Sequence, residues 1–585
     1  MYTKLLKRNF PILLLLSAFF LGILIAHIST LFQSENDKFQ SFTKKLFQEE
    51  IQSNTISLHY TLAEPASFDI HNYPITFGEI STDSAKESAT QIQALQKKLA
   101  AFDYEKLSSE NQLTYDILKL SLNTEAELSA HPLLQEPLSP TLGIQAQLPV
   151  LLAEYTFRTK QDIEDYFCLL EAVPAYFNEI LKFEQEKSAA GTFMSDTTAQ
   201  RIIDQCDSFT AVPKENYLIS VFNDKISKCD FISEKKYSDY QAQNKELILN
   251  SLIPAYQTLS DGLASLNGTG VNAYGLCYYP GGTEYYLTLI KSSTGIYDTI
   301  ETMTSRLYDQ MHSDFLQIQR LLTVDPDLPS KSQDEITALQ MDTDPQAILT
   351  HLQEQMLLDF PALSDASYSV KYVHEDLEEY LSPAFYLTPP IDTLTPNSIY
   401  LNNHNELKGI SLYSTLAHEG FPGHMYQTLY FSQANPDPIR HIFATGGFVE
   451  GWATYIENYA YQYAPVDYET GQYVALNRSF YLCLYSLLDI YIHYYGWTEA
   501  DASEYLEALG ITDKTSQKEI CQILIEDPAN YLKYCLGSLS IQDLKTDARQ
   551  RLGNDFELQN FHKALLEIGP APFPVIEQYL FKKMS

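Results

Sequence analysis

Apolar side chains recur at helical spacing along most of the chain from about residue 40 to residue 300. The pattern runs with few helix-breaking residues through 87–99, 115–128, 155–183 and 244–263. Proline and glycine are concentrated in short loops, and strict alternation of apolar and polar residues is rare. This part of the chain is therefore predicted to be almost entirely α-helical.

One later segment departs from the helical pattern. Residues 382–402 read SPAFYLTPPIDTLTPNSIYLN, and the prolines in this segment exclude a regular helix. Its aromatic and isoleucine residues favour short extended strands or an edge pair. Helical spacing returns from about residue 403.

The N-terminus carries a different signal. Lys4, Lys7 and Arg8 precede an apolar run over residues 10–32. A secretory signal has an apolar region of roughly 7–15 residues, whereas this run is closer to the roughly 20 residues that span a bilayer. No clear small-residue cleavage site follows it, so we expect an uncleaved anchor in preference to a cleaved signal. The basic residues predict a single-pass protein with an extracytoplasmic body, or a secreted body if the segment is cleaved.

The chain has 585 residues, enough for a large core or more than one lobe. We divide it into a signal or membrane anchor, a polar linker, an N-terminal helical region and a C-terminal helical region, over residues 1–33, 34–40, 41–300 and 301–585. Asp and Glu number 75 against 39 Lys and Arg, a formal net charge of −36. This charge argues against nucleic acid as a partner, and we expect membrane contact only through the N-terminal helix.

Seven cysteines are too few for a disulfide scaffold. If the body is exported, Cys206–Cys229 and Cys521–Cys535 are the pairs close enough in sequence to test. Small buried thiols are the equally good alternative. No CxxC or Cys/His cluster occurs, which argues against a thiolate zinc site.

The densest group of polar residues is HEGFPGH at 418–424, followed by EGWATYIE at 450–457. Two imidazoles and a carboxylate are the ligands that a catalytic zinc takes, with one position left for water. In the usual helical motif H-E-x-x-H, a spacing of four residues places both histidines on one face. His418 and His424 are six residues apart, which on a regular helix leaves the second about 120° from the first.

A bulged or broken turn would bring the two histidines back together. Pro422 lacks an N–H, and the glycines on either side of the Phe-Pro pair tolerate unusual backbone angles. Glu419 would then face the metal-activated water as general base. We expect Glu450 as third ligand and Glu457, on the same helix face, as the residue that orients a histidine. The spacing alone leaves open that these are surface charges or satisfied core groups.

These two segments resemble a bacterial family, domain-of-unknown-function family 885, whose members carry H-E-x-x-P-G-H and then E-G-W-A-x-Y-x-E. The resemblance extends to YPGGTEYY, to LDIYIH with GWTE, and to FH with the glycine and proline that follow it, at residues 279–286, 488–499 and 561–576. Tyr534 and Gly537 match a Y-x-x-G element whose flanking residues fit loosely. The resemblance covers most of residues 50–585.

This family is similar in motif order to large helical zinc oligopeptidases and carboxypeptidases. The resemblance implies a mainly α, two-lobed body with a deep cleft and a small β-sheet beside the active-site helix. It implies one Zn²⁺ with ligands His418, His424 and Glu450, and the catalytic residues Glu419, His493 and Tyr534. The last two would stabilise the oxyanion that forms when a carbonyl is attacked; packing between helices is the alternative role for both.

We therefore expect an exported, membrane-anchored zinc hydrolase that acts on a peptide or another small amide. Two alternatives stay open. The chain could be a non-catalytic peptide-binding or sensor protein whose metal site is structural or vestigial, or a metal-dependent hydrolase of a non-peptide amide or ester. A His₂Glu site also accepts other divalent metals such as Co²⁺ or Mn²⁺.

Overall fold

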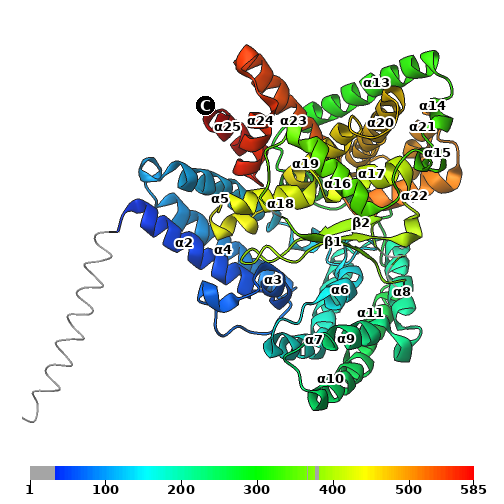
Figure 1. The fold of residues 1–585 in the computed structure, drawn as a ribbon. Helices are drawn as coiled ribbons and strands as arrows, with labels where there is room; N and C mark the ends of the chain where they lie inside the picture. Colours follow the sequence, from blue (N-terminus) through cyan, green and yellow to red (C-terminus); the bar gives the residue numbers. More distant parts are fainter. Residues whose placement is uncertain (1–32, 365, 376–377, 379–380, 585) are drawn as a thin grey trace, which may run out of the picture.

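The computed structural model of the protein describes residues 33–584 except 365, 376–377 and 379–380, and Figure 1 shows a mainly helical body with one small sheet near its middle. The helices before residue 300 are α2 (Glu35–Gln52), α3 (Thr55–Thr61), α4 (Thr82–Ala100), α5 (Ser109–Leu128), α6 (Ile144–Glu154), α7 (Lys160–Ala190), α8 (Asp196–Thr210), α9 (Tyr217–Ile226), α10 (Glu234–Leu247), α11 (Ile253–Ala264) and α12 (Gly282–Thr294). The later helices are α13 (Ile300–Val324), α14 (Leu328–Lys331), α15 (Asp334–Ala338), α16 (Pro345–Gln355), α17 (Gly409–Glu419), α18 (His424–Gln433), α19 (Gly446–Ala460), α20 (Tyr468–His493), α21 (Glu499–Ala508), α22 (Lys514–Glu526), α23 (Asn530–Leu552), α24 (Leu558–Ile568) and α25 (Phe573–Met584). The predicted mainly helical fold is confirmed.

The sheet contains three strands, β1 (Tyr368–Tyr372), β2 (Ala384–Leu387) and β3 (Asn397–Leu401), in the order β1–β3–β2. The central strand β3 pairs parallel to β1 and antiparallel to β2. The two strands predicted within residues 382–402 are therefore confirmed. The sequence did not predict β1, a short edge strand whose residues are all half-buried or exposed.

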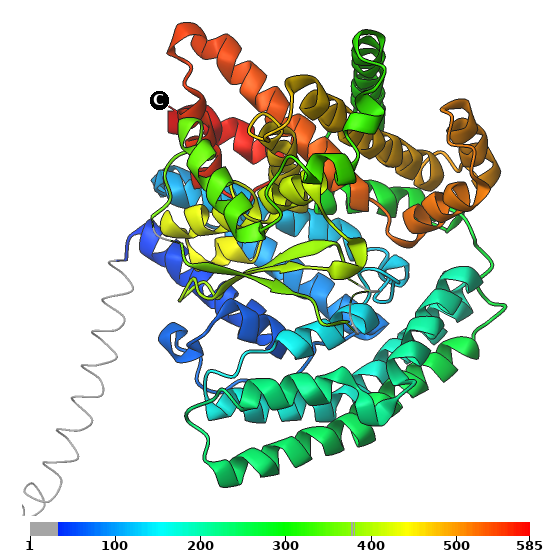
Figure 2. The same cartoon turned by 45° about the vertical axis from the view of Figure 1, so that its right-hand side comes forward.

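Strand β3 is the element where two apolar cores meet. All five of its residues are buried, and alternate side chains point to opposite faces. Ile399 and Leu401 belong to the core formed by the C-terminal helices, whereas Tyr400 belongs to the core of α6 to α11. Figures 1 and 2 show these two groups of helices on opposite sides of the sheet.

The predicted boundary at residue 300 does not coincide with a boundary between the apolar cores. Leu113 and Ile117 of α5, with Tyr286 and Ile290 of α12, are part of the same core as the helices after residue 300. A third core joins α2 to α5. Helices from both sides of residue 300 therefore share one core, and apolar periodicity could not show this because it carries no information on which helix faces pack together.

Residues 34–40, predicted as a polar linker, instead cap and begin α2. The hydroxyl of Ser34 accepts a hydrogen bond from the amide of Asp37, whose carboxylate accepts one from the amide of Ser34, a capping box that starts the helix. The apolar run at 10–32, on which the anchor prediction rests, lies outside the described residues. Within the described ones, no helix combines the length and apolar character needed to cross a bilayer.

All seven cysteines lie in the described part of the chain and are free thiols. Neither pair singled out from the sequence forms a bridge. Cys535 instead contacts Cys483 on α20, with the two sulfur atoms 3.4 Å apart. Cys206, Cys483, Cys521 and Cys535 are buried, which agrees with a role as small apolar residues.

Candidate metal centre

The chain breaks its helix between the two histidines of the motif. Helix α17 ends at Glu419 and α18 begins at His424, with a cis peptide bond between Phe421 and Pro422 in the connection. A β-carbon at Gly423 would lie 1.8 Å from the carbonyl oxygen of His418, so the close approach requires glycine. The indole of Trp452 donates a hydrogen bond of 2.9 Å to the carbonyl of Pro422. The predicted break in the helix is confirmed.

The break brings the two imidazoles together around the carboxylate of Glu450 on α19. Nε2 of His418 lies 3.7 Å and Nε2 of His424 lies 3.4 Å from Oε2 of Glu450. Each residue offers one ligand atom, and the three atoms lie within 4.8 Å of one another. Two imidazole nitrogens and one carboxylate oxygen at this spacing fit a divalent ion of the zinc type.

Glu457 lies two turns after Glu450 on α19 and contacts the ring nitrogen of His418 that is not directed at Glu450. Its carboxylate lies 2.6 Å from Nδ1 of His418 and also accepts a hydrogen bond of 2.9 Å from Nε of Arg478. This contact turns Nε2 of His418 toward Glu450, the arrangement that orients histidine ligands in metal sites. The predicted role of Glu457 in orienting a histidine agrees with this contact.

The electrostatics show how strongly the cluster favours positive charge. Burial acts to lower the pKa of His418, but hydrogen bonds to Glu450 and Glu457 outweigh burial and raise it to about 10. Burial acts to raise the pKa of Glu457, but Arg478 and His418 lower it to about 2. The same competition holds the pKa of Glu450 well below its usual range, with His418 and His424 as the opposing groups. A cation between these residues would replace the proton that the metal-free cluster binds.

Glu419 is held beside the cluster by the small sheet. One carboxylate oxygen accepts a hydrogen bond of 2.8 Å from the backbone amide of Tyr386 in β2, and the other lies 4.0 Å from Nε2 of His418. Glu419 is only 7 % exposed. The sheet therefore lies beside the helix of the motif, as the family resemblance implied, and fixes the direction of this carboxylate.

Tyr534 lies on α23, which packs closely on α19 through glycines. A β-carbon at Gly451 would lie 2.4 Å from the carbonyl carbon of Gly537, and one at Gly537 would lie 2.0 Å from the carbonyl oxygen of Gly447. Burial and then the charges of Glu450 and Glu419 raise the pKa of the Tyr534 phenol far above its usual value. The phenol is thus a neutral hydroxyl that experiences the charges of the cluster.

His493 does not join the cluster. Its Nδ1 accepts a hydrogen bond of 3.0 Å from the amide of Leu276, and its Nε2 lies 2.8 Å from the carbonyl of Leu524, to which it donates. Burial lowers the pKa of this imidazole to about 4, so it is neutral at pH 7. Both ring nitrogens are used by the backbone, which leaves none for an oxyanion. The structure gives His493 the packing role that was the alternative in the sequence.

Sequence reasoning missed two contributors to the site. Arg478 is the only lysine or arginine on α20, and its guanidinium supports Glu457. A single lysine or arginine in an otherwise largely apolar helix was a signal that Arg478 has a specific contact. Nothing in the sequence showed that the partner is Glu457. The backbone amide of Tyr386 had no signal, because a main-chain donor depends only on the path of β2.

Comparison with known proteins identifies the family. The chain matches the family described as "Bacterial protein of unknown function (DUF885)" over residues 75–580, and it belongs to that family. A search of curated proteins found no match.

Two solved structures have the same fold. "The putative lipoprotein from Colwellia psychrerythraea" is similar with a TM-score of 0.80 and 19 % identity, covering 94 % of this chain and 99 % of that one. "A putative lipoprotein of unknown function from Shewanella oneidensis" is similar with a TM-score of 0.64 and 17 % identity, covering 93 % and 99 %. At these identities the likeness establishes the fold alone.

Proposed function

We propose that the protein is a metal-dependent hydrolase of peptide-type amide bonds. The observation that carries the proposal is the convergence of His418, His424 and Glu450, with Glu419 beside them and Glu457 behind His418. When bound there, a zinc-type ion supplies Lewis acidity that polarises a carbonyl and makes water a stronger acid.

The protein's own residues would supply the proton transfers and the orientation. Glu419, held by the amide of Tyr386, would take a proton from the attacking water and pass it to the leaving amine. The neutral hydroxyl of Tyr534 would donate to the carbonyl oxygen as negative charge develops on it. Glu457 would keep Nε2 of His418 directed at Glu450 throughout.

We further propose that the body acts outside the cytoplasm. The basic residues ahead of the apolar run at 10–32 support this, as does the description of both structural relatives as putative lipoproteins. The first cysteine of this chain is Cys168, so the apolar run itself, and not a lipid on a nearby thiol, would be the anchor.

Two variants test the hydrolase. In Glu419→Gln, metal content is expected to stay unchanged while peptide hydrolysis is lost, because the amide cannot take a proton. In His418→Ala, both metal and hydrolysis are expected to be lost. Glu469→Gln, an exposed position at the start of α20, is the matched control. Hydrolysis by Glu419→Gln at the rate of the unmodified protein would disprove the mechanism.

The same preparations separate the alternatives. Mass spectrometry of products from mixed peptides and from amide- or ester-containing cell-wall fragments identifies the bond that is cleaved. Zinc-loaded protein that binds peptides across a broad library without cleaving any would be a binding or sensor protein instead.

A further inference from the structure

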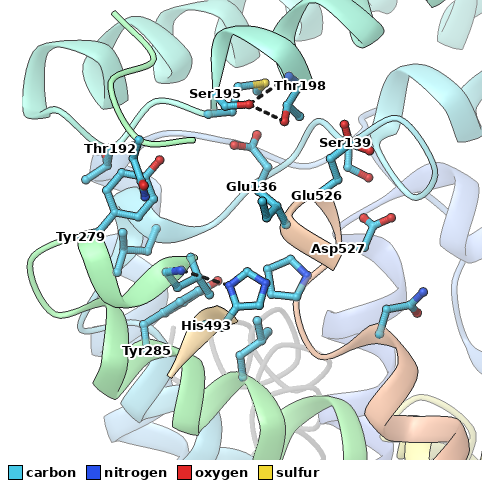
Figure 3. Close-up of a pocket in the computed structure, with 18 of the residues that line it drawn as sticks. Glu136, Ser139, Thr192, Ser195, Thr198, Tyr279, Tyr285, His493, Glu526 and Asp527 are labelled. Atoms are coloured by element: carbon cyan, nitrogen blue, oxygen red, sulfur yellow. Dashed lines mark hydrogen bonds between the residues drawn. The ribbon is translucent and has the colours of Figure 1, made fainter. Parts of the chain in front are cut away.

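A cavity of about 280 Å³ lies between the two groups of helices. Its upper wall in Figure 3 comes from α7, α8 and the loop before α6, and its lower wall from α12, the end of α20 and the segment that joins α22 to α23. His493 forms part of the lower wall, and Tyr279 and Tyr285 of the YPGGTEYY segment lie beside it. The YPGGTEYY segment therefore lines part of this cavity.

Three carboxylates line this cavity, from Glu136 on one side and Glu526 and Asp527 on the other. Two lysines also line it. The ammonium of Lys187 is bonded to Glu136 and lies 3.3 Å from a second carboxylate, Glu184. The ammonium of Lys533 lies over the ring of Tyr534, 5.3 Å from its centre.

The polar atoms that lack partners in the cavity wall are acceptors. Oδ1 of Asn530 is buried and receives no hydrogen bond from any described residue, whereas Oε2 of Glu526 is buried with Nη1 of Arg201 3.4 Å away. Glu526 is 6 % exposed, and Gln522 donates to its other oxygen. Arg201 divides its charge between Glu526 and Glu519. Burial raises the pKa of Glu526 to about 7 and also raises that of Asp527. A buried acceptor without a donor is costly, so the cavity favours a ligand that brings N–H donors and positive charge.

Helix α23 carries both a residue of the cavity wall and Tyr534. Asn530 is the first residue of this helix and Tyr534 lies one turn later, about 6 Å along the axis. One or two amino-acid residues of an extended peptide cover that distance. A group bound at Asn530 and Glu526 could therefore belong to the same peptide whose carbonyl reaches Tyr534.

We propose that this cavity binds a primary ammonium group of the substrate, with Glu526 as the main carboxylate, Asn530 as a further acceptor and the tyrosines as cation-binding walls. The ammonium could be the amino terminus of a peptide or a lysine-type side chain. The inference rests on the proposed hydrolase for its role in catalysis, but the binding can be measured without turnover.

The test uses full-length, zinc-loaded protein carrying Glu419→Gln, so that peptides bind without being cleaved. Three pentapeptides with a C-terminal fluorescein are compared by fluorescence anisotropy: pentaalanine with a free amino terminus, its N-acetylated form, and an N-acetylated form with one lysine. We expect the free amine, the lysine peptide or both to bind at least tenfold more tightly than the uncharged form.

Adding Glu526→Gln, which keeps the shape and the contact with Gln522, is expected to reduce this preference to less than twofold. Asp527→Asn is a second variant expected to weaken it. Glu519→Gln, which removes a carboxylate from the same Arg201 but does not line the cavity, is the matched control and should preserve it.

Equal binding of all three peptides, no binding of any, or a preference that survives Glu526→Gln would overturn the inference. A preference for only one of the two charged peptides identifies the source of the ammonium. If the preference is found but the protein without Glu419→Gln cleaves nothing, the cavity assignment stands and the hydrolase proposal fails. If the unmodified protein cleaves peptides but no preference is found, the hydrolase proposal stands and the cavity assignment fails.

Discussion

The contact between Glu457 and His418 predicts the strength of metal binding. Glu457→Gln preserves the size of the side chain but removes the negative charge that lies 2.6 Å from Nδ1 of His418 and 2.9 Å from Nε of Arg478. His418, His424 and Glu450 all remain in place. The loss of a carboxylate behind a histidine ligand typically weakens metal binding about 10- to 100-fold, or about 1.4–2.7 kcal/mol.

The assay is a competition titration of zinc against a chelating indicator at pH 7.5, with the full-length protein. Glu457→Gln is expected to show the 10- to 100-fold weaker binding, while Glu469→Gln, exposed on the neighbouring helix, should match the unmodified protein. A zinc dissociation constant for Glu457→Gln within twofold of the unmodified value would refute the idea that this carboxylate supports a ligand.

Three further variants test the proposed mechanism and the stability of the fold. Tyr534→Phe should retain metal but lower kcat for peptide hydrolysis about 100-fold, because one donor to the carbonyl oxygen is lost; unchanged kcat would remove Tyr534 from the mechanism. Gly451→Ala should lower the free energy of unfolding by about 1–3 kcal/mol in a urea titration, because its β-carbon would lie 2.4 Å from Gly537. Burial lowers the pKa of His562 to about 3, so the unfolded chain binds more protons at this residue and the protein becomes less stable as pH drops below 6.5. Between pH 6.5 and 5 the contribution of His562 to this loss is about 2 kcal/mol. His562→Gln should remove this contribution, as measured by urea titrations at the two pH values.

Local sequence patterns predicted the features that depend on neighbouring residues. The break at Gly420 to Gly423 followed from the six-residue spacing and Pro422, and the alignment of Glu450 with Glu457 followed from helix periodicity. The strands within 382–402 followed from proline and aromatic content. These predictions succeeded because each one needed only the chain within about seven residues.

Several contacts between residues distant in sequence were not predicted. The sequence did not show that α5 and α12 pack into the same core as the helices after residue 300. His493 was matched to a family motif, but its partners are backbone groups of Leu276 and Leu524, which no side-chain pattern reveals. The pairing of Arg478 with Glu457 joins two helices, and charge alone could not give it.

Every step of the proposed hydrolysis depends on a metal ion bound by His418, His424 and Glu450, and elemental analysis detects such an ion. Full-length protein purified without chelators is compared with His424→Ala by mass spectrometry of metals. We expect about one zinc or similar divalent ion per chain in the unmodified protein and close to none in the variant. Unmodified protein free of metal, or equal metal in both preparations, would contradict this expectation.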